Sequence, residues 1–179
     1  MTAPSLSIRT AHPSDRDAIA RLTRVAYAEY AAVMEPSAWS ALEQAIEASL
    51  ASADGVTRLV ATLDDVIVGS AALYAPDSDA YGSLASAASW PEVRLVAVDP
   101  SARGRGVARA LVDECARRAR AAGARVLGLH TSRSMRAAKT LYEQMGFVRD
   151  PEHDFHPPGA ELVEGYLLRL DDPASHPES

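Results

Sequence analysis

One stretch constrains the fold more than any other, and it spans residues 93–112 with the sequence VRLVAVDPSARGRGVARALV. It begins as an apolar, β-branched run over 93–98 and breaks at Asp99-Pro100. A turn with two glycines and two arginines follows, and apolar residues then resume at helical spacing from Val107 onward. The stretch therefore predicts a buried strand that leads through a glycine-rich turn into a helix.

A turn of this kind is a potential anion-binding site. The N–H groups of the first helical turn have no partners within the helix, and the helix dipole places partial positive charge there. Gly104 and Gly106 allow the backbone to approach a phosphate, while Arg103 and Arg105 add positive charge. We expect a pyrophosphate ligand; the alternative is a tight turn that binds nothing.

Two common phosphate-binding motifs are not matched here. A Walker A motif needs Lys and then Ser or Thr after its last glycine, whereas Val107 and Ala108 follow Gly106. The dinucleotide pattern G-x-G-x-x-G needs a third glycine where Arg109 stands. A nucleotide-phosphate protein is therefore disfavoured.

Composition narrows the classes of protein further. The 179 residues carry a formal net charge of −6, which argues against a nucleic-acid-binding protein. The single cysteine, Cys115, falls on the apolar face of its predicted helix and is expected in the core. The sequence shows neither a signal peptide nor an apolar run long enough to span a membrane, so we expect a cytoplasmic protein without a membrane partner.

The chain as a whole reads as one mixed α/β domain over 1–170 with a polar tail at 171–179. Ser14 is the expected N-cap of a first helix that runs to about residue 32, and a second helix is expected over about 36–53. A hairpin turns at Asp64-Asp65, and a long loop over 76–91 suggests a functional flap. The predicted order is β-α-α-β-β-β-α-β-α-β-β, with further strands near 125–131, 147–150 and 161–170 and a helix over 135–145.

Two motifs carry a resemblance to a known family. Arg103-x-x-Gly106-x-Ala108 matches the [Arg/Gln]-x-x-Gly-x-[Gly/Ala] signature of the GCN5-related N-acetyltransferase (GNAT) family. The segment AAKTLYEQMGF, residues 137–147, resembles its second motif, A-x-x-L-Y-E-x-x-G-F. The resemblance covers the element order from about residue 6 to 170. It implies a mixed, mostly antiparallel sheet flanked by helices, and acetyl-CoA as co-substrate for transfer of an acetyl group directly to an amine.

The resemblance also implies where the cofactor would bind, without a metal. The backbone amides of the turn would hold the pyrophosphate of acetyl-CoA, and the strand backbone would hold its pantetheine arm. The turn residues are Arg103, Gly104, Arg105, Gly106, Val107 and Ala108, and the strand residues are Val96, Ala97 and Val98. A backbone N–H near Val96 would stabilise the oxyanion. Met135 replaces an asparagine that many relatives carry, so Ser132 or Ser134 substitutes for that contact or the contact is missing.

The reaction needs a base and an acid. Glu92, at the start of the central strand, is the candidate base, acting directly or through water, because an alkyl ammonium must lose a proton before it attacks. Tyr142 stands where the family motif places the acid that protonates the CoA thiolate. The alternatives are an exposed carboxylate at a strand start and a packed helix tyrosine.

The acceptor is an amine, either a small molecule or a peptide N-terminus. The candidate acceptor-binding residues are Tyr27, Tyr30, Trp39, His130 and Phe155, although the first three could equally fill core and a lone strand histidine such as His130 is more often structural. His153, Asp154 and His156 could form a metal site, but a loop between the last strands is favoured. A homodimer is compatible with the family. The competing function is a non-catalytic acyl-CoA-binding or regulatory module on the same fold.

Overall fold

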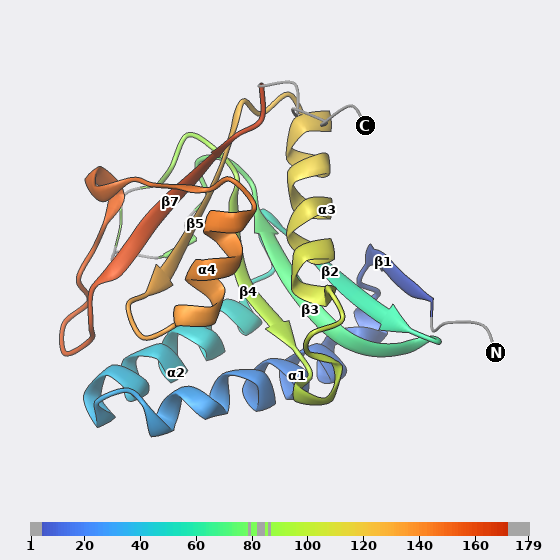
Figure 1. Ribbon diagram of the computed structural model, residues 1–179, viewed down its shortest axis with the longest axis horizontal. Helices are drawn as coiled ribbons and strands as arrows, with labels where there is room; N and C mark the ends of the chain where they lie inside the picture. The colour runs from blue at the N-terminus through green and yellow to red at the C-terminus, as the bar shows by residue number, and fades with distance from the viewer. Residues whose placement is uncertain (1–4, 79, 82–84, 86, 172–179) are drawn as a thin grey trace.

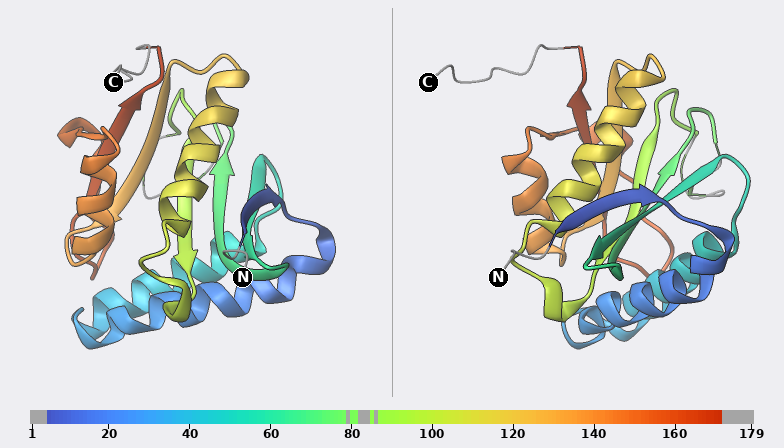
Figure 2. Two further views of the ribbon diagram at one scale, coloured as in Figure 1. Left: turned by 45° about the vertical axis from the view of Figure 1, so that its right-hand side comes forward. Right: turned by 90° about the vertical axis from the view of Figure 1, so that its right-hand side faces the viewer.

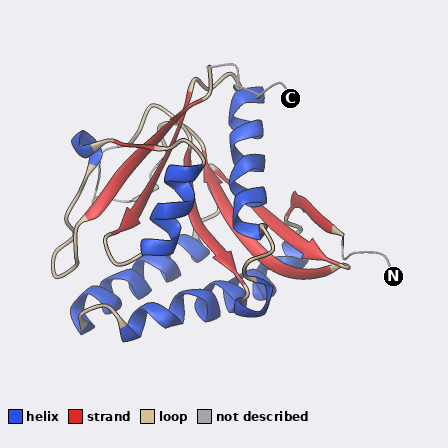
Figure 3. Ribbon diagram, viewed as in Figure 1, coloured by secondary structure: helices blue, strands red, loops and turns tan. Residues whose placement is uncertain are grey.

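The computed structural model describes residues 5–78, 80–81, 85 and 87–171, and it contains a seven-stranded sheet (Figures 1 and 3). The strands are β1 (Leu6–Thr10), β2 (Val56–Leu63), β3 (Val66–Tyr74), β4 (Glu92–Val98), β5 (Val126–Ser132), β6 (Val148–Arg149) and β7 (Val163–Arg169). The helices are α1 (Arg16–Tyr27), α2 (Pro36–Ala51), α3 (Val107–Ala121) and α4 (Arg136–Gln144). Except for Asp171, the predicted polar tail lies outside the described residues, as do residues 79, 82–84 and 86 of the predicted loop.

The strand order is β1-β2-β3-β4-β5-β7-β6, and every neighbouring pair is antiparallel except β4 and β5. This arrangement confirms the predicted mixed, mostly antiparallel α/β fold. Figure 1 shows α3 and α4 on one side of the sheet with β4 visible between them, and α1 and α2 running together across its lower part; the views in Figure 2 agree. Within the described residues no helix is both long and apolar enough to cross a bilayer.

The hairpin of β2 and β3 forms as predicted. Its turn residues Asp64 and Asp65 both adopt positive φ, 47° and 65°, as a two-residue turn between twisted strands requires. The core under α3 also agrees with the helical pattern, because Val107, Leu111 and Cys115 are all buried. Burial raises the pKa of the Cys115 thiol to about 12, so this cysteine is a core residue rather than a nucleophile.

The centre of the sheet is irregular at β4. Two residues, Leu95 and Val96, face the single residue Ala71 on β3, and Leu95 has φ of +50°. Such a bulge bends the strand that contains it. On its other side β4 pairs with β5 only at Glu92 and Val93, so the two parallel strands separate beyond that point. The separation opens a gap between two strands that a regular sheet would join.

The N-cap of the first helix was predicted wrongly. A 3-10 turn over Pro13–Asp15 precedes α1, and Ser14 makes no capping bond. Asp15 instead accepts hydrogen bonds from the backbone N–H of His12 at 2.7 Å and from the guanidinium of Arg9 at 2.6 Å. The bond to Arg9 ties the turn to β1. The helix ends at Tyr27, and a 3-10 segment, Ala28–Ala32, continues it. The second helix, α2, ends at Ala51, two residues before the expected end.

Candidate active site

The glycine-arginine turn leads directly into α3, and its backbone is available to a ligand. Among the described residues, none accepts a hydrogen bond from the six consecutive N–H groups of residues 104–109. Gly104 and Gly106 have φ of +74° and +76°, a conformation that side chains disfavour, and each faces open space. Six free donors at a helix N-terminus form a positive, concave surface suited to a phosphate.

The Arg103 side chain is paired with residues at the end of α1 and just after it. Its guanidinium donates to Glu29 at 2.6 Å and to the carbonyl of Ala26 at 3.3 Å, which ties the turn to the end of α1. Both side chains of this ion pair are partly exposed, 41% and 50%. Glu29 therefore places a negative charge beside the predicted anion site and neutralises much of the positive charge of Arg103.

A cleft of about 450 Å³ runs from this turn along the separated part of β4 to α4. Its lining includes Val96 and Val98 from β4, the turn itself and the face of α4 that carries Tyr142. Ala97 belongs to the same strand but is buried away from the cleft lining. The cleft therefore connects the predicted pyrophosphate site, the separated strand edge and the predicted acid.

Tyr142 is buried against Phe147, with ring centroids 5.8 Å apart. Within the described part of the chain its hydroxyl has no hydrogen-bond partner, and the residue lines the cleft. Burial, and then the neighbouring hydroxyls of Tyr27 and Tyr30, raise the pKa of Tyr142 far above the usual value for a phenol. The hydroxyl is therefore protonated at any physiological pH and is available as a donor.

Met135 has a structural role that explains a residue of this type. It is 8% exposed and packs with Met34 and Ala38 in a small apolar cluster between the start of α4 and the break between the first two helices. Ser134 does not face the cleft as a free group, because both its N–H and its hydroxyl bond to Glu161, at 2.9 and 2.8 Å. A polar side chain at 135 would be placed in an apolar environment.

The aromatic residues before α2 separate into two groups. Tyr27 and Tyr30 line the cleft, with ring centroids 5.8 Å apart. Trp39 packs on the apolar cluster around Met135 and does not line the cleft.

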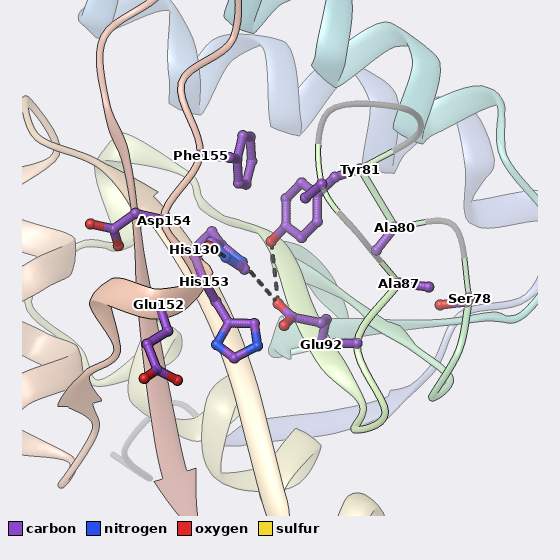
Figure 4. Close-up of a pocket in the computed structure, with 12 residues that line it drawn as sticks. Ser78, Ala80, Tyr81, Ala87, Glu92, His130, Glu152, His153, Asp154 and Phe155 are labelled. Atoms are coloured by element: carbon purple, nitrogen blue, oxygen red, sulfur yellow. Dashed lines mark hydrogen bonds and ion pairs between the residues drawn. The ribbon is translucent and has the colours of Figure 1, made fainter.

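A second cavity of about 390 Å³ lies at the other end of the β4–β5 gap, around Glu92 (Figure 4). Glu92 is 4% exposed, which excludes the alternative of an exposed carboxylate at the strand start. Its Oε1 accepts from the Trp90 indole at 3.1 Å; its Oε2 accepts from the Tyr81 hydroxyl at 3.4 Å and lies 3.2 Å from Nδ1 of His130. A buried carboxylate with three polar partners beside a cavity is a candidate catalytic group.

His130 and Phe155, two of the candidate acceptor-binding residues, both line this cavity. Together with Tyr81 they form three rings in mutual contact, with centroids 4.7 to 5.1 Å apart. Figure 4 shows these rings and Glu92 directed toward one another. His130 lines both this cavity and the cleft. No sequence pattern pointed to Tyr81, because it belongs to a loop without periodicity.

The histidines of the last loop are engaged separately. His153 contacts the Asp150 carboxylate, and His156 contacts the carbonyl of Ala160 at 2.6 Å. Asp154 pairs with Arg149 at 2.7 Å, and this ion pair lowers the pKa of Asp154 below the usual value for a carboxyl. Across the described ranges, no three His, Cys, Asp or Glu side chains gather closely enough to hold a metal ion.

Comparison with solved structures places this fold among acetyltransferases. The Escherichia coli ribosomal-protein-S18-alanine N-acetyltransferase is 17% identical, with a TM-score of 0.64 over 98% of this chain and 100% of that one. The Salmonella typhimurium protein yncA, solved with its cofactor acetyl-CoA, is 22% identical, with a TM-score of 0.61 over 95% and 96%. The Thermoplasma acidophilum paia N-acetyltransferase, in complex with coenzyme A, is 16% identical, with a TM-score of 0.64 over 90% and 98%. At these identities the likeness establishes the fold.

A search of curated protein sequences finds no match. The family model of the GNAT acetyltransferases, in contrast, matches residues 20–147, which include the turn, the cleft and both predicted catalytic residues. With that match over most of its length, and with the fold to accompany it, the chain belongs to the acetyltransferase (GNAT) family.

Proposed function

We propose that this protein is an N-acetyltransferase that moves the acetyl group of acetyl-CoA directly to an amine. The observation that carries the proposal is one continuous cleft lined by Gly104 and by residues 106–109, whose amides have no acceptor among the described residues, by a separated strand edge and by a protonated tyrosine. Relatives of the same fold bind acetyl-CoA or coenzyme A. The amides of residues 104–109 would hold the pyrophosphate, and the strand backbone from Val96 to Val98 would bond to the amides of the pantetheine arm.

The chemistry assigns a role to each end of the gap. Glu92 lies in the second cavity and would receive the proton that an ammonium must lose before it attacks the thioester. A backbone N–H at the bulge, near Val96, would stabilise the oxyanion that forms. The Tyr142 hydroxyl would then donate to the departing sulfur, and its protonated state over the physiological range suits that role.

The acceptor would enter through the cavity around Glu92, with Phe155 and Tyr81 as walls. Aromatic rings and a buried carboxylate favour a cationic amine over an acidic one. A small-molecule amine and a peptide N-terminus both satisfy this chemistry. Tyr27 and Tyr30 would border the acetyl-CoA side of the site rather than the acceptor.

The test is a calorimetric titration with acetyl-CoA, with ATP as the control ligand. We expect acetyl-CoA to bind and ATP not to bind. Gly106→Glu should abolish binding, because a carboxylate would face the pyrophosphate. Gly123→Glu is the matched control: Gly123 also has positive φ and open space, but it lies past the other end of α3. Equal affinity of wild type and Gly106→Glu would refute the phosphate assignment.

Turnover with a panel of amines separates an enzyme from a non-catalytic acyl-CoA-binding module. An enzyme releases free thiol from acetyl-CoA faster when the right amine is present. Binding without amine-dependent thiol release from any member of the panel would favour the module.

A further inference from the structure

Both ring nitrogens of His130 face oxygen atoms. Nε2 lies 2.8 Å from the backbone carbonyl of His153, and Nδ1 lies 3.2 Å from Oε2 of Glu92. A carbonyl oxygen can only accept a hydrogen bond, so Nε2 carries a proton. A neutral imidazole with its proton on Nε2 has a bare lone pair at Nδ1, which would repel a bare carboxylate. The contact between His130 and Glu92 therefore requires a second proton.

The surroundings of Glu92 indicate which of the two groups carries that proton. The indole N–H of Trp90 and the hydroxyl of Tyr81 both donate to the carboxylate, at 3.1 and 3.4 Å, and such bonds favour its ionised form. The contact then consists of an imidazolium N–H and a carboxylate. Both side chains are nearly inaccessible, 7% and 5% exposed, and the 3.2 Å between Nδ1 and Oε2 leaves no room for a water molecule between them.

We propose that Glu92 and His130 act as one acid–base pair that holds a single proton, and that this pair, rather than Glu92 alone, exchanges the proton of the acceptor amine. The inference rests on the proposed function and adds His130 to its machinery. A lone carboxylate is a weak base toward an amine, whereas an imidazole and a carboxylate that compete for one proton bind it together. His130 lines both cavities, so its ring lies between the acceptor and the cofactor cleft.

The protons balance across the reaction. The proton-free pair, a carboxylate and a neutral imidazole, takes one proton from the ammonium and becomes the loaded pair, which is the form inferred from the contacts of His130. The neutral amine attacks the thioester carbon, and the C–S bond breaks. Tyr142 gives its hydroxyl proton to the thiolate. The nitrogen then loses its second proton to Tyr142, which restores the hydroxyl. The loaded pair returns its proton to solvent before the next cycle.

The fold holds the imidazole in place from several elements. His130 is opposite Gly165 on β7, and a Cβ there would lie 3.4 Å from Nε2 and 2.9 Å from the carbonyl of Asp150. The glycine thus lets the 150–155 segment cross over β7 and bring the His153 carbonyl to the ring. Tyr81 and Phe155 pack on the ring from the other sides.

Besides Glu92, other charged or titratable groups lie around the His130 ring, and they come from three parts of the chain. They are Tyr81 from the 76–91 loop, Arg94 from β4, and Glu152, His153 and Asp154 from the segment before β7. Arg94 stacks on Tyr81 with its guanidinium carbon 4.2 Å from the ring centre. The Asp154 carboxylate points away from Glu92 in Figure 4 and is paired with Arg149, so it does not share the Nδ1 proton.

The first test needs no acceptor and reads the proton directly. In protein labelled with ¹⁵N-histidine, the ring nitrogens of His130 should both resonate as protonated nitrogens at pH 7, assigned by their loss in His130→Asn. Glu92→Gln should convert the ring to the neutral form with its proton on Nε2. A neutral His130 ring in the wild type would overturn the pair.

The second test uses the amine that turns over fastest in the panel. In His130→Asn the amide nitrogen takes the place of Nδ1, so it can still donate to Glu92 but cannot release and regain a proton. We expect kcat to fall at least 20-fold, with less than a threefold change in the amine KM and in the Kd of acetyl-CoA, and the rising limb of the pH–rate profile to change. His156→Asn is the matched control and should match wild type.

A kcat within twofold of wild type in His130→Asn would show that the histidine only positions Glu92, and would overturn the proposal. If no amine turns over, the proposed function fails while the resonance experiment still decides whether the pair holds a proton. The two failures are therefore distinguishable.

Discussion

Glu92 and Gly128 are register partners where β4 meets β5, and the Glu92 carboxylate occupies the space that a Cβ atom on Gly128 would need. Such a Cβ would lie 2.5 Å from Oε1 of Glu92 and 2.4 Å from the indole nitrogen of Trp90. The position of the candidate base therefore depends on a glycine in the neighbouring strand.

Gly128→Ala should displace both side chains. We expect kcat to fall at least tenfold at saturating acetyl-CoA, with the Kd of acetyl-CoA within twofold, and a loss of about 1–3 kcal/mol in the free energy of unfolding from overpacking. Gly69→Ala is the control for the loss of stability only, because its Cβ would meet Val107 at 2.6 Å on the α3 side of the sheet and would not touch Glu92. A Gly128→Ala enzyme with wild-type kcat would show that the position of Glu92 is not critical.

Removing the charge of Glu29 should strengthen cofactor binding. Glu29→Gln removes a negative charge from the cleft lining and frees Arg103 to approach a phosphate. Exposed ion pairs are worth about 0–1 kcal/mol, so the Kd of acetyl-CoA should fall by up to about fivefold at low salt, and the gain should shrink at 0.5 M salt. Glu47→Gln breaks a comparable exposed pair with Arg24, away from the cleft, and should leave the Kd unchanged. Weaker binding by Glu29→Gln would mean that the ion pair orders the turn.

Tyr142→Phe should lower kcat by about 10- to 100-fold while the Kd of acetyl-CoA stays within threefold, because only the donor to sulfur is lost. The raised pKa of Tyr142 keeps its hydroxyl protonated, so the wild-type kcat should not decline between pH 7 and 9 through ionisation of this group. Initial rates across that range test both statements. An unchanged rate in Tyr142→Phe would remove this residue as the acid.

The contact between Asp15 and Arg9 should make stability depend on pH. The Arg9 guanidinium, followed by the backbone N–H of His12, lowers the pKa of Asp15 to about 2. Because the unfolded value is about 4, the folded state gains stability above pH 4 and loses it as the pH falls toward 2. Asp15→Asn should therefore cost about 2 kcal/mol at pH 7, and its difference from wild type should shrink between pH 4 and pH 2.5. The free energy of unfolding in urea, measured for both proteins at each pH, tests this prediction.

The exposed neighbour of Asp15 provides the control for that measurement. Asp17→Asn removes an exposed carboxylate in the first turn of α1 and should cost much less free energy of unfolding at pH 7 than Asp15→Asn. If the difference in free energy of unfolding between Asp15→Asn and wild type stayed constant with pH, the carboxylate would act through packing rather than charge.

The sequence predicted the parts of the fold that depend on local patterns. The strand, turn and helix around Gly106 and the hairpin at Asp64 follow from β-branched runs, positive-φ turn residues and helical spacing, and all of them form. The error at Ser14 arose because Asp15 bonds to Arg9 on β1, a contact between elements that local capping preferences do not contain.

The environment of Glu92 could not be derived in this way. Its partners come from a loop, from the preceding residues and from β5, and only the register of β4 against β5 brings His130 to it. The bulge at Leu95 was not predicted either, since a leucine with φ of +50° is an exception to the backbone preferences on which sequence patterns rest.

The gap between β4 and β5 creates two strand edges inside the molecule. An exposed edge normally invites pairing with a strand of another chain, and proteins protect against this by covering it. Here Tyr27, Tyr30 and Tyr142 belong to the lining of the cleft along the separated part of β4, so three large side chains of the same chain border the unpaired edge. The edge that could recruit a foreign strand is thus kept within the protein's own cleft.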